Sequence, residues 1–120
     1  MHDEISLRAR AERELEMAHQ ARQARNEGKA RVCARRAAGI AIGAWLSREW
    51  SSANVVSAIE RLRVVADDAR QPDSIRAAAH HLTLRINVDH GLPVAADPLV
   101  DARQLLTYFL DDSRKDADNV

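Results

Sequence analysis

Apolar residues recur at intervals of three and four along most of this chain, the spacing at which side chains share one face of an α-helix. No segment alternates apolar and polar positions as a half-buried strand does. Only four Gly and three Pro interrupt the pattern. We therefore expect an all-α fold, an antiparallel up-down helical bundle of about five helices.

The pattern predicts a first helix over Asp3–Arg25 and a second over Lys29–Trp45 or slightly beyond. Residues 26–28 form the break between them, and Gly28 there suits a left-handed helix cap. The inward stripe of the first helix consists of Leu7, Ala11, Leu15 and Ala18.

The second predicted helix is apolar on two sides, which is typical of a helix at the centre of a bundle or of one that packs on a second partner. Its main apolar face consists of Ala30, Cys33, Ala34, Ala37, Ala38, Ile40, Ala41, Ala44 and Trp45. Its other side carries Val32, Gly39, Gly43 and Leu46, with Ile42 at the edge. Glycine inside a helix costs about 1 kcal/mol relative to alanine. Gly39 and Gly43 therefore indicate a close helix contact, within the subunit or across a dimer.

Two shorter helices follow. The first is expected over Ala53–Ala69, with an N-cap from the serine pair at 51–52, and residues 71–73 end it. Asp73 or Ser74 then caps the second. The inward faces are Val55, Ala58, Ile59, Leu62, Val65 and Ala66 in the first of these helices, and Ile75, Ala78, Ala79, Leu82 and Ile86 in the second.

A final helix is expected over Asp97–Leu110, because Asp97 suits an N-cap and Pro98 the first helical position. Its buried face consists of Leu99, Ala102, Leu105, Leu106, Phe109 and Leu110. We expect one domain over residues 1–112 and a frayed polar tail over residues 113–120.

The composition is that of a globular domain, with 46% apolar and 30% charged residues. Aromatic residues make up only 3%, so the core must be aliphatic and rich in alanine. The single cysteine, Cys33, excludes an internal disulfide and a Cys-based zinc site, and its place on the inward face favours a small buried apolar group. No apolar run approaches the length of a membrane span, and since no charged-then-apolar pattern occurs we expect no signal peptide. We expect a cytoplasmic protein that does not enter the membrane.

Five histidines are present, but they do not form a metal-binding pattern. His80 and His81 are adjacent, so they point about 100° apart on a helix and cannot easily share a metal. A glycine-rich phosphate loop, a paired-carboxylate pattern and a nucleophile motif are all missing from the sequence. We therefore expect neither a metal nor a cofactor.

The net charge is zero, yet residues 1–50 carry a net +3 and residues 51–120 a net −3. A basic cluster surrounds the first turn: Arg22, Arg25, Lys29, Arg31, Arg35 and Arg36. Arg22 and Arg25 continue the inward stripe of the first helix. Lys29 and Arg31 lie in the first turn of the second, where the helix dipole disfavours cations. Two readings stay open: ion pairs with Glu14 or a partner's carboxylate, or contact with an anion such as a phosphate or RNA.

The order and length of these helices resemble those of the HEPN superfamily, small bundles named for higher eukaryotes and prokaryotes nucleotide binding. Its members have two long N-terminal helices, then shorter ones, then a closing C-terminal helix. The predicted helices follow that order over most of the chain.

The resemblance also implies a candidate catalytic pair. HEPN ribonucleases carry an Arg and, a few residues later, a His, which assemble at a dimer interface and cut RNA without metal. Arg76 and His81 fit this spacing, in the helix expected to bear the pair. The same spacing occurs for Arg13 with His19 and for Arg85 with His90.

Two positions depart from the family pattern: Ala77 replaces a polar residue and Thr83 replaces a frequent Tyr. Many HEPN-like proteins lack a working pair and serve as partners of nucleotidyltransferases or other modules. We therefore predict a non-catalytic HEPN-like interaction module that forms a homodimer and belongs to a nucleotide- or RNA-linked complex. The alternatives are a metal-independent ribonuclease of toxin type and a plain helical adaptor.

Overall fold

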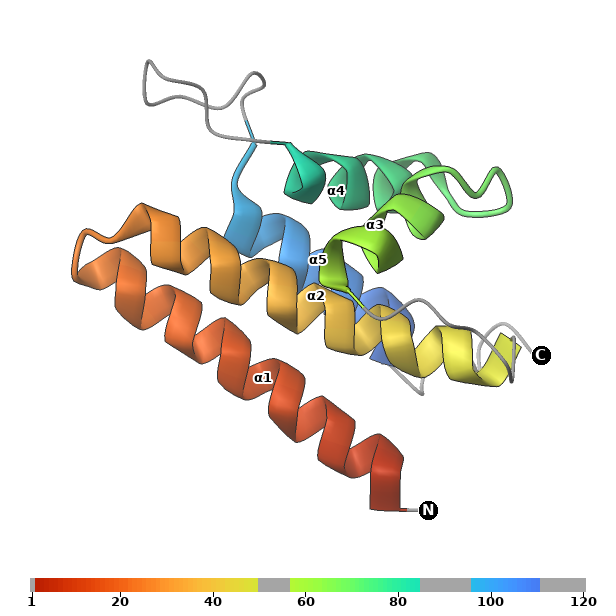
Figure 1. Cartoon of the computed structure of the whole chain (residues 1–120), viewed down its shortest axis with the longest axis horizontal. Coiled ribbons are helices and arrows are strands. Elements are labelled where there is room, and N and C mark those ends of the chain that lie inside the picture. Colours follow the sequence, from red (N-terminus) through yellow and green to blue (C-terminus); the bar gives the residue numbers. More distant parts are fainter. Residues whose placement is uncertain (1, 50–56, 85–95, 111–120) are drawn as a thin grey trace.

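The computed structural model describes residues 2–49, 57–84 and 96–110, and these residues form a bundle of α-helices (Figure 1). The all-α fold predicted from the apolar stripes is confirmed. The helices are α1 (His2–Gln23), α2 (Glu27–Glu49), α3 (Ala58–Ala66), α4 (Asp73–Thr83) and α5 (Pro98–Leu110).

Helix α2 is the centre of the bundle, because it contacts each of the other four helices. α1 and α2 form a long antiparallel hairpin, and α3 and α4 form a shorter one above it (Figure 1). α5 lies behind α2 in this view and also packs on α1 and α4. The central position explains why α2 is apolar on two sides.

The core is built largely from alanine. The inward stripe of α1 is confirmed, since Ala11, Leu15 and Ala18 are buried and Leu7 packs against them. Buried alanines line the facing side of α2 at Ala30, Ala34, Ala37, Ala38, Ala41 and Ala44. Small side chains on both helices let α1 and α2 approach closely. Cys33 is a free, buried thiol in this core.

The turn between α1 and α2 differs from the prediction at Gly28, which lies inside α2 and has no positive φ. The left-handed residue is Arg25, with φ of 62°. The Arg25 N–H donates to the Arg22 carbonyl and the Asn26 N–H to the Ala21 carbonyl, the hydrogen-bond pair of a Schellman cap. The Asn26 side chain then accepts from the Lys29 N–H, which caps α2 two residues earlier than expected.

The start of α3 also differs from the prediction. Ser57 has extended backbone angles and is the N-cap, so the helix begins at Ala58 rather than Ala53. Its hydroxyl accepts from the Glu60 N–H at 3.0 Å and donates to the Glu60 carboxylate at 2.9 Å. The Ser-x-x-Glu sequence is that of a capping box, a stronger start signal than the serine pair at 51–52, although the Glu60 carboxylate here accepts from the Ser57 hydroxyl rather than from its backbone N–H. That serine pair and Val55 lie outside the described residues.

Helices α3 and α4 are shorter than predicted. α3 ends at Ala66, three residues early, where the Asp67 N–H donates to the carbonyl of Arg63. Asp73 is the first residue of α4 rather than its cap, and Pro72 takes the cap position without a side-chain bond. α4 ends at Thr83. Of the expected faces, Leu62, Val65, Ile75, Ala78, Ala79 and Leu82 are buried. Ala58, Ile59 and Ala66 of α3 are only half-buried, and Ile86 lies outside the described residues.

The predicted start of α5 is confirmed. The Asp97 carboxylate accepts from the Leu99 N–H at 3.0 Å, and Pro98 is the first helical residue. Every residue of the expected buried face of α5 is buried. Trp45 of α2 packs on Phe109 of α5 with ring centroids 5.3 Å apart. The tail predicted over residues 113–120 lies outside the described residues.

Candidate functional site

Four polar side chains from three helices meet where α4 ends. Arg31 and Arg35 come from α2, His81 from the last turn of α4, and Asp101 from the first turn of α5. We call these four residues the Arg–His–Asp cluster. The fold brings them together across about seventy residues of sequence, so their spacing along the chain gives no sign of it.

His81 and Asp101 form the centre of the cluster. Nδ1 of His81 lies 3.2 Å from Oδ2 of Asp101, whose residue is only 8% exposed. Burial raises the pKa of the Asp101 carboxyl, while His81 and Arg31 oppose that shift. The carboxylate thus orients the imidazole ring, which stays partly accessible.

Arg31 and Arg35 tie the end of α4 to α2. Arg35 donates from Nε to the Leu82 carbonyl at 2.7 Å and from Nη2 to the Leu84 carbonyl at 2.9 Å. Nη2 of Arg31 lies 3.4 Å from the His81 carbonyl. The last carbonyls of a helix lack partners within the helix and attract cations, so both arginines stabilise this end.

Arg31 is the most buried cation among the residues for which the structure describes burial, at 4% exposed. Its Nε has no hydrogen-bond partner within that part of the chain. Burial, helped by the nearby charge of Arg35, lowers the pKa of its guanidinium, and Asp101 opposes this. Arg31 therefore keeps unused donor capacity beside His81 and Asp101.

The structure places Arg76 and His81 in different contacts. Nε of Arg76 donates to the Ala66 carbonyl at 3.1 Å, which caps the end of α3, whereas His81 faces Asp101. No contact between Arg76 and His81 is found among the described residues of the subunit. His81 instead meets Asp101 through Nδ1 and Arg31 through its backbone carbonyl.

The basic cluster predicted around the first turn is divided between different environments. Arg22 binds two carboxylates, Glu27 at 2.7 Å and Asp97 at 3.0 Å. These hydrogen bonds and charges, Glu27 first, raise the pKa of its guanidinium. Glu14, the internal partner considered from the sequence, has a buried Oε1 without a hydrogen-bond partner in the described part of the chain.

Arg25 does not continue the inward stripe. α1 ends at Gln23, and the left-handed turn at Arg25 directs its side chain to solvent, so that expectation is wrong. Lys29 and Arg36 are also exposed. Arg22, Arg31 and Arg35 thus serve internal contacts, and Arg25, Lys29 and Arg36 form the outer part of the cluster.

Gly39 and Gly43 lie where α2 meets α3. A Cβ atom on Gly39 would lie 2.8 Å from the Cβ of Ala58, and one on Gly43 would lie 2.5 Å from Nη1 of Arg61. Arg61 uses this space to donate from Nη1 to the Gly39 carbonyl at 2.9 Å. The close contact is therefore within the subunit, between α2 and α3.

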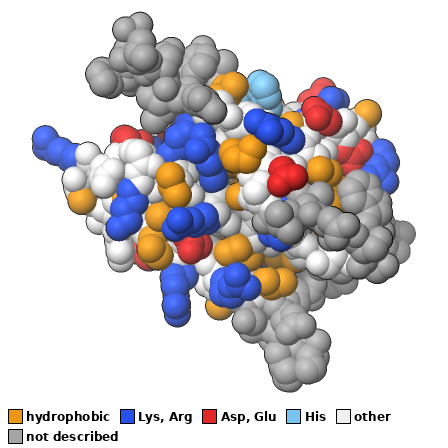
Figure 2. Space-filling view, in the orientation of Figure 1, with side chains coloured by type: hydrophobic (Ala, Val, Ile, Leu, Met, Phe, Trp, Pro, Cys, Tyr) orange, Lys and Arg blue, Asp and Glu red, His pale blue; other side chains and the backbone are white. Residues whose placement is uncertain are grey.

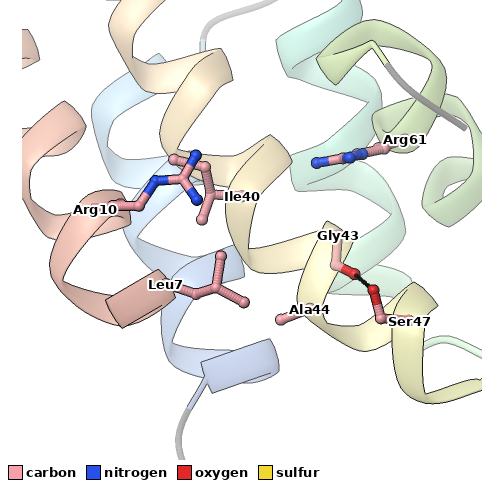
Figure 3. Close-up of a pocket in the computed structure, with 7 residues that line it drawn as sticks. All are labelled: Leu7, Arg10, Ile40, Gly43, Ala44, Ser47 and Arg61. Carbon is pink, nitrogen blue, oxygen red and sulfur yellow. Dashed lines mark hydrogen bonds between the residues drawn. The ribbon is translucent and has the colours of Figure 1, made fainter. Parts of the chain in front are cut away.

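A pocket of about 180 Å³ opens beside this contact, between α1, α2 and α3 (Figure 3). Arg10 and Arg61 flank it from opposite sides, while Leu7 and Ala44 point into it. The lining residues are Leu7, Arg10, Ile40, Gly43, Ala44, Ser47 and Arg61. The Ser47 hydroxyl donates to the Gly43 carbonyl at 3.0 Å.

Sequence reasoning missed Asp101 and Arg61. Asp101 lies four residues before Leu105 and is therefore a charged residue on the buried stripe of α5. Arg61 lies three residues after Ala58 and four before Val65, at the edge of the α3 stripe. A charged residue at such a position is the signal that could have identified both.

No group of three or more His, Cys, Asp or Glu side chains that could hold a metal gathers within the described ranges. None of the helices there combines the length and apolar character needed to cross a bilayer. A scan against protein-family models, a search of curated proteins and a search of solved structures each found no match. The resemblance to the HEPN superfamily stays a prediction based on helix order.

Proposed function

We propose that the chain is a non-catalytic helical interaction module of the HEPN-like kind. One observation carries this proposal: Arg76 and His81, the candidate catalytic pair, are committed to separate internal contacts with Ala66 and Asp101. A site that cuts RNA must hold its groups in one productive geometry around the reacting phosphate. Within the subunit the two side chains hold different partners, so a cleaving site would require them to leave these contacts and meet across a dimer.

The division of the basic cluster supports the same proposal. Arg22 is engaged with two carboxylates and Arg35 with helix-end carbonyls, so these two guanidinium groups already serve internal contacts. Association with RNA or a nucleotide then depends on the outer part of the cluster. Homodimerisation, or pairing with a protein such as a nucleotidyltransferase, brings the module into a nucleotide- or RNA-linked complex.

A ribonuclease is the second candidate, and one observation favours it. His81 is oriented by Asp101, and its backbone carbonyl lies 3.4 Å from Nη2 of Arg31, whose Nε has no partner in the described part of the chain. An oriented histidine next to a cation is the arrangement that general acid–base chemistry at a phosphate needs. Its arginine would then be Arg31 rather than Arg76.

The full chain incubated with single-stranded RNA tests these two functions. We expect no cleavage with or without a metal chelator. Cleavage that resists the chelator and is lost in His81→Ala, but persists in His80→Ala, would overturn the module. His80 is the matched control because it is exposed and adjacent in sequence. Sedimentation of the same samples tests the homodimer, which a monomer at all concentrations would contradict.

Binding of labelled oligouridine at low salt tests the nucleic-acid association. We expect affinity that falls steeply as salt rises, because phosphate contacts release counterions. The triple variant Arg25→Ala, Lys29→Ala and Arg36→Ala should weaken it. Undetectable binding at low salt would contradict the RNA-linked proposal and leave the plain adaptor.

A further inference from the structure

The pocket between α1, α2 and α3 places charged groups beside apolar ones. Two guanidinium groups, those of Arg10 and Arg61, stand on opposite sides of apolar side chains from Leu7, Ile40 and Ala44 (Figure 3). No acidic residue is among the seven lining residues that the structure describes. The pocket therefore carries guanidinium groups at its edges and apolar side chains at its floor.

Arg61 is held in position before any ligand arrives. Its Nη1 donates to the Gly39 carbonyl, and the bare backbone at Gly43 leaves space for the guanidinium beside α2. A charged group fixed in this way loses little conformational entropy on binding. Arg10 is exposed on α1 and completes the edge opposite Arg61.

The size of the pocket favours a side chain of a partner over a separate small molecule. Its volume of about 180 Å³ is below the range of about 300–1,000 Å³ typical of small-molecule sites. A single aliphatic side chain from a binding partner fits a hollow of this size, in the way that anchor residues fill pockets at interfaces.

The chemistry of the lining also favours an acidic peptide segment over RNA. Binding of single-stranded nucleic acid relies on aromatic side chains that stack with bases, and none of the seven lining residues is aromatic. Figure 2 shows Lys and Arg side chains gathered over α1 and α2 on this face, with few acidic side chains between them. A partner that carries carboxylates on both sides of an aliphatic residue complements both features.

We propose that this pocket binds an acidic segment of a protein partner, whose aliphatic side chain enters between Leu7, Ile40 and Ala44 while flanking carboxylates pair with Arg10 and Arg61. The inference rests on the proposed function as an interaction module, because it names the surface and the partner chemistry. It assigns no role to the Arg–His–Asp cluster.

Amide-detected NMR titration of the full chain tests the proposal. The probe is a synthetic helical peptide with Leu flanked by Glu one turn away on each side. We expect saturable shifts at Leu7, Gly43 and Ala44, and no such shifts with a peptide in which Ser replaces that Leu. Shifts confined to other surfaces, or equal shifts with both peptides, would overturn the proposal.

Two charge reversals test whether the peptide binds at the pocket or is attracted only by the net charge of the protein. Arg10→Glu changes a lining residue and Arg36→Glu an exposed residue of α2 outside the lining, so both change the net charge equally. We expect Arg10→Glu to weaken the peptide about tenfold and Arg36→Glu about twofold or less. Equal weakening by both would overturn the proposal, as would oligouridine that shifts the same pocket amides and displaces the peptide.

The outcomes distinguish this inference from the proposed function. Chelator-resistant RNA cleavage that depends on His81 would overturn the module, whatever the peptide does. If the peptide shifts no amide resonance of the pocket, the proposed docking site is wrong. The absence of RNA cleavage would still support the interaction module.

Discussion

The guanidinium of Arg61 occupies the space that a side chain at Gly43 would need. A Cβ atom at that position would lie 2.5 Å from Nη1 and 2.9 Å from Cζ of Arg61. The same Nη1 donates to the Gly39 carbonyl one turn earlier in α2. The two glycines of α2 thus serve different purposes: Gly43 admits the arginine, and Gly39 admits the backbone of α3 at Ala58.

Gly43→Ala should destabilise the wild-type chain and stabilise an Arg61→Ala variant. Alanine favours a helix interior by about 1 kcal/mol over glycine. In the wild type, however, it displaces Arg61 from a charge-assisted hydrogen bond worth about 1.5–3 kcal/mol. We expect a net loss of about 1 kcal/mol in the free energy of urea unfolding, and a gain of similar size without Arg61. Changes of the same sign in both backgrounds would refute this account of Gly43.

Gly39→Ala should cost more than Gly28→Ala. A Cβ at Gly39 would lie 2.8 Å from the Cβ and 3.2 Å from the Cα of Ala58, so α3 must move away from α2. Overpacking of this kind costs about 1–3 kcal/mol. At Gly28 the nearest atom is Oδ1 of Asn26 at 3.8 Å, an ordinary contact, and alanine there should leave stability unchanged or raise it. Equal melting temperatures for the two variants would contradict this difference.

Arg35→Met should loosen α4 while leaving the α1–α2 hairpin intact. The change removes the two hydrogen bonds to the Leu82 and Leu84 carbonyls and leaves those helix-end groups without their cation. We expect a loss of about 2–3 kcal/mol. Hydrogen exchange should accelerate most at the amides of α4. Arg36→Met is the control, because Arg36 is exposed, and faster exchange in that variant would argue against a specific role for Arg35.

Asp97 caps α5 and also forms an ion pair with Arg22. Two variants separate these roles. Asp97→Ser keeps a side-chain acceptor for the Leu99 N–H but removes the charge that meets Arg22. Asp97→Ala removes both. We expect a cost below about 1 kcal/mol for serine, since the ion pair is only half-buried. Alanine should cost about 1 kcal/mol more because the cap is lost. Equal costs for the two variants in urea unfolding would rule out the capping role.

Protonation of Asp68 at low pH should remove part of the stability of the turn between α3 and α4. Hydrogen bonds from Arg70, helped by Gln71, lower the pKa of Asp68 to about 2. A carboxyl whose pKa is lowered on folding contributes stability above its ordinary pKa of about 3.9. That contribution is lost as the pH falls from about 4 toward 2.

Arg70→Ala should raise the pKa of Asp68 toward its ordinary value and reduce the loss of stability over that pH range. An NMR titration of the Asp68 carboxyl measures the first effect, and unfolding at pH 4 and pH 2 measures the second. Arg63→Ala is a suitable control, since Arg63 is exposed in α3. A pKa that stays near 2 in Arg70→Ala would contradict this prediction. It would show that the backbone N–H at position 70 is enough to keep the pKa of Asp68 low.

The helices were predicted well where their apolar stripes and capping residues depend only on residues close together in the sequence. The apolar stripes of α1, α4 and α5, and the Asp97–Pro98 start, depend only on neighbouring residues. The capping box at Ser57 was present in the sequence but competed with an earlier serine pair. At the first turn, glycine is the residue that most readily takes a left-handed angle, yet the Schellman hydrogen bonds place that angle on Arg25.

The candidate site was less predictable because its contacts are tertiary. Arg35 reaches carbonyls at positions 82 and 84, and carbonyl groups are present at every residue, so no side-chain pattern marks its targets. The pairing of His81 with Asp101 depends on how α4 crosses α5. A spacing rule along one helix, such as that for Arg76 and His81, cannot describe a site made from three helices.

The buried alanines where α1 packs on α2 determine which substitutions this fold tolerates. Ala11, Ala18, Ala34 and Ala37 are each fully buried and have only a methyl group to lose. Cores of large side chains are damaged mainly by truncation, whereas this seam is damaged mainly by enlargement. We therefore expect an Ala→Val or Ala→Thr change at these positions to destabilise the fold more than an Ala→Ser change.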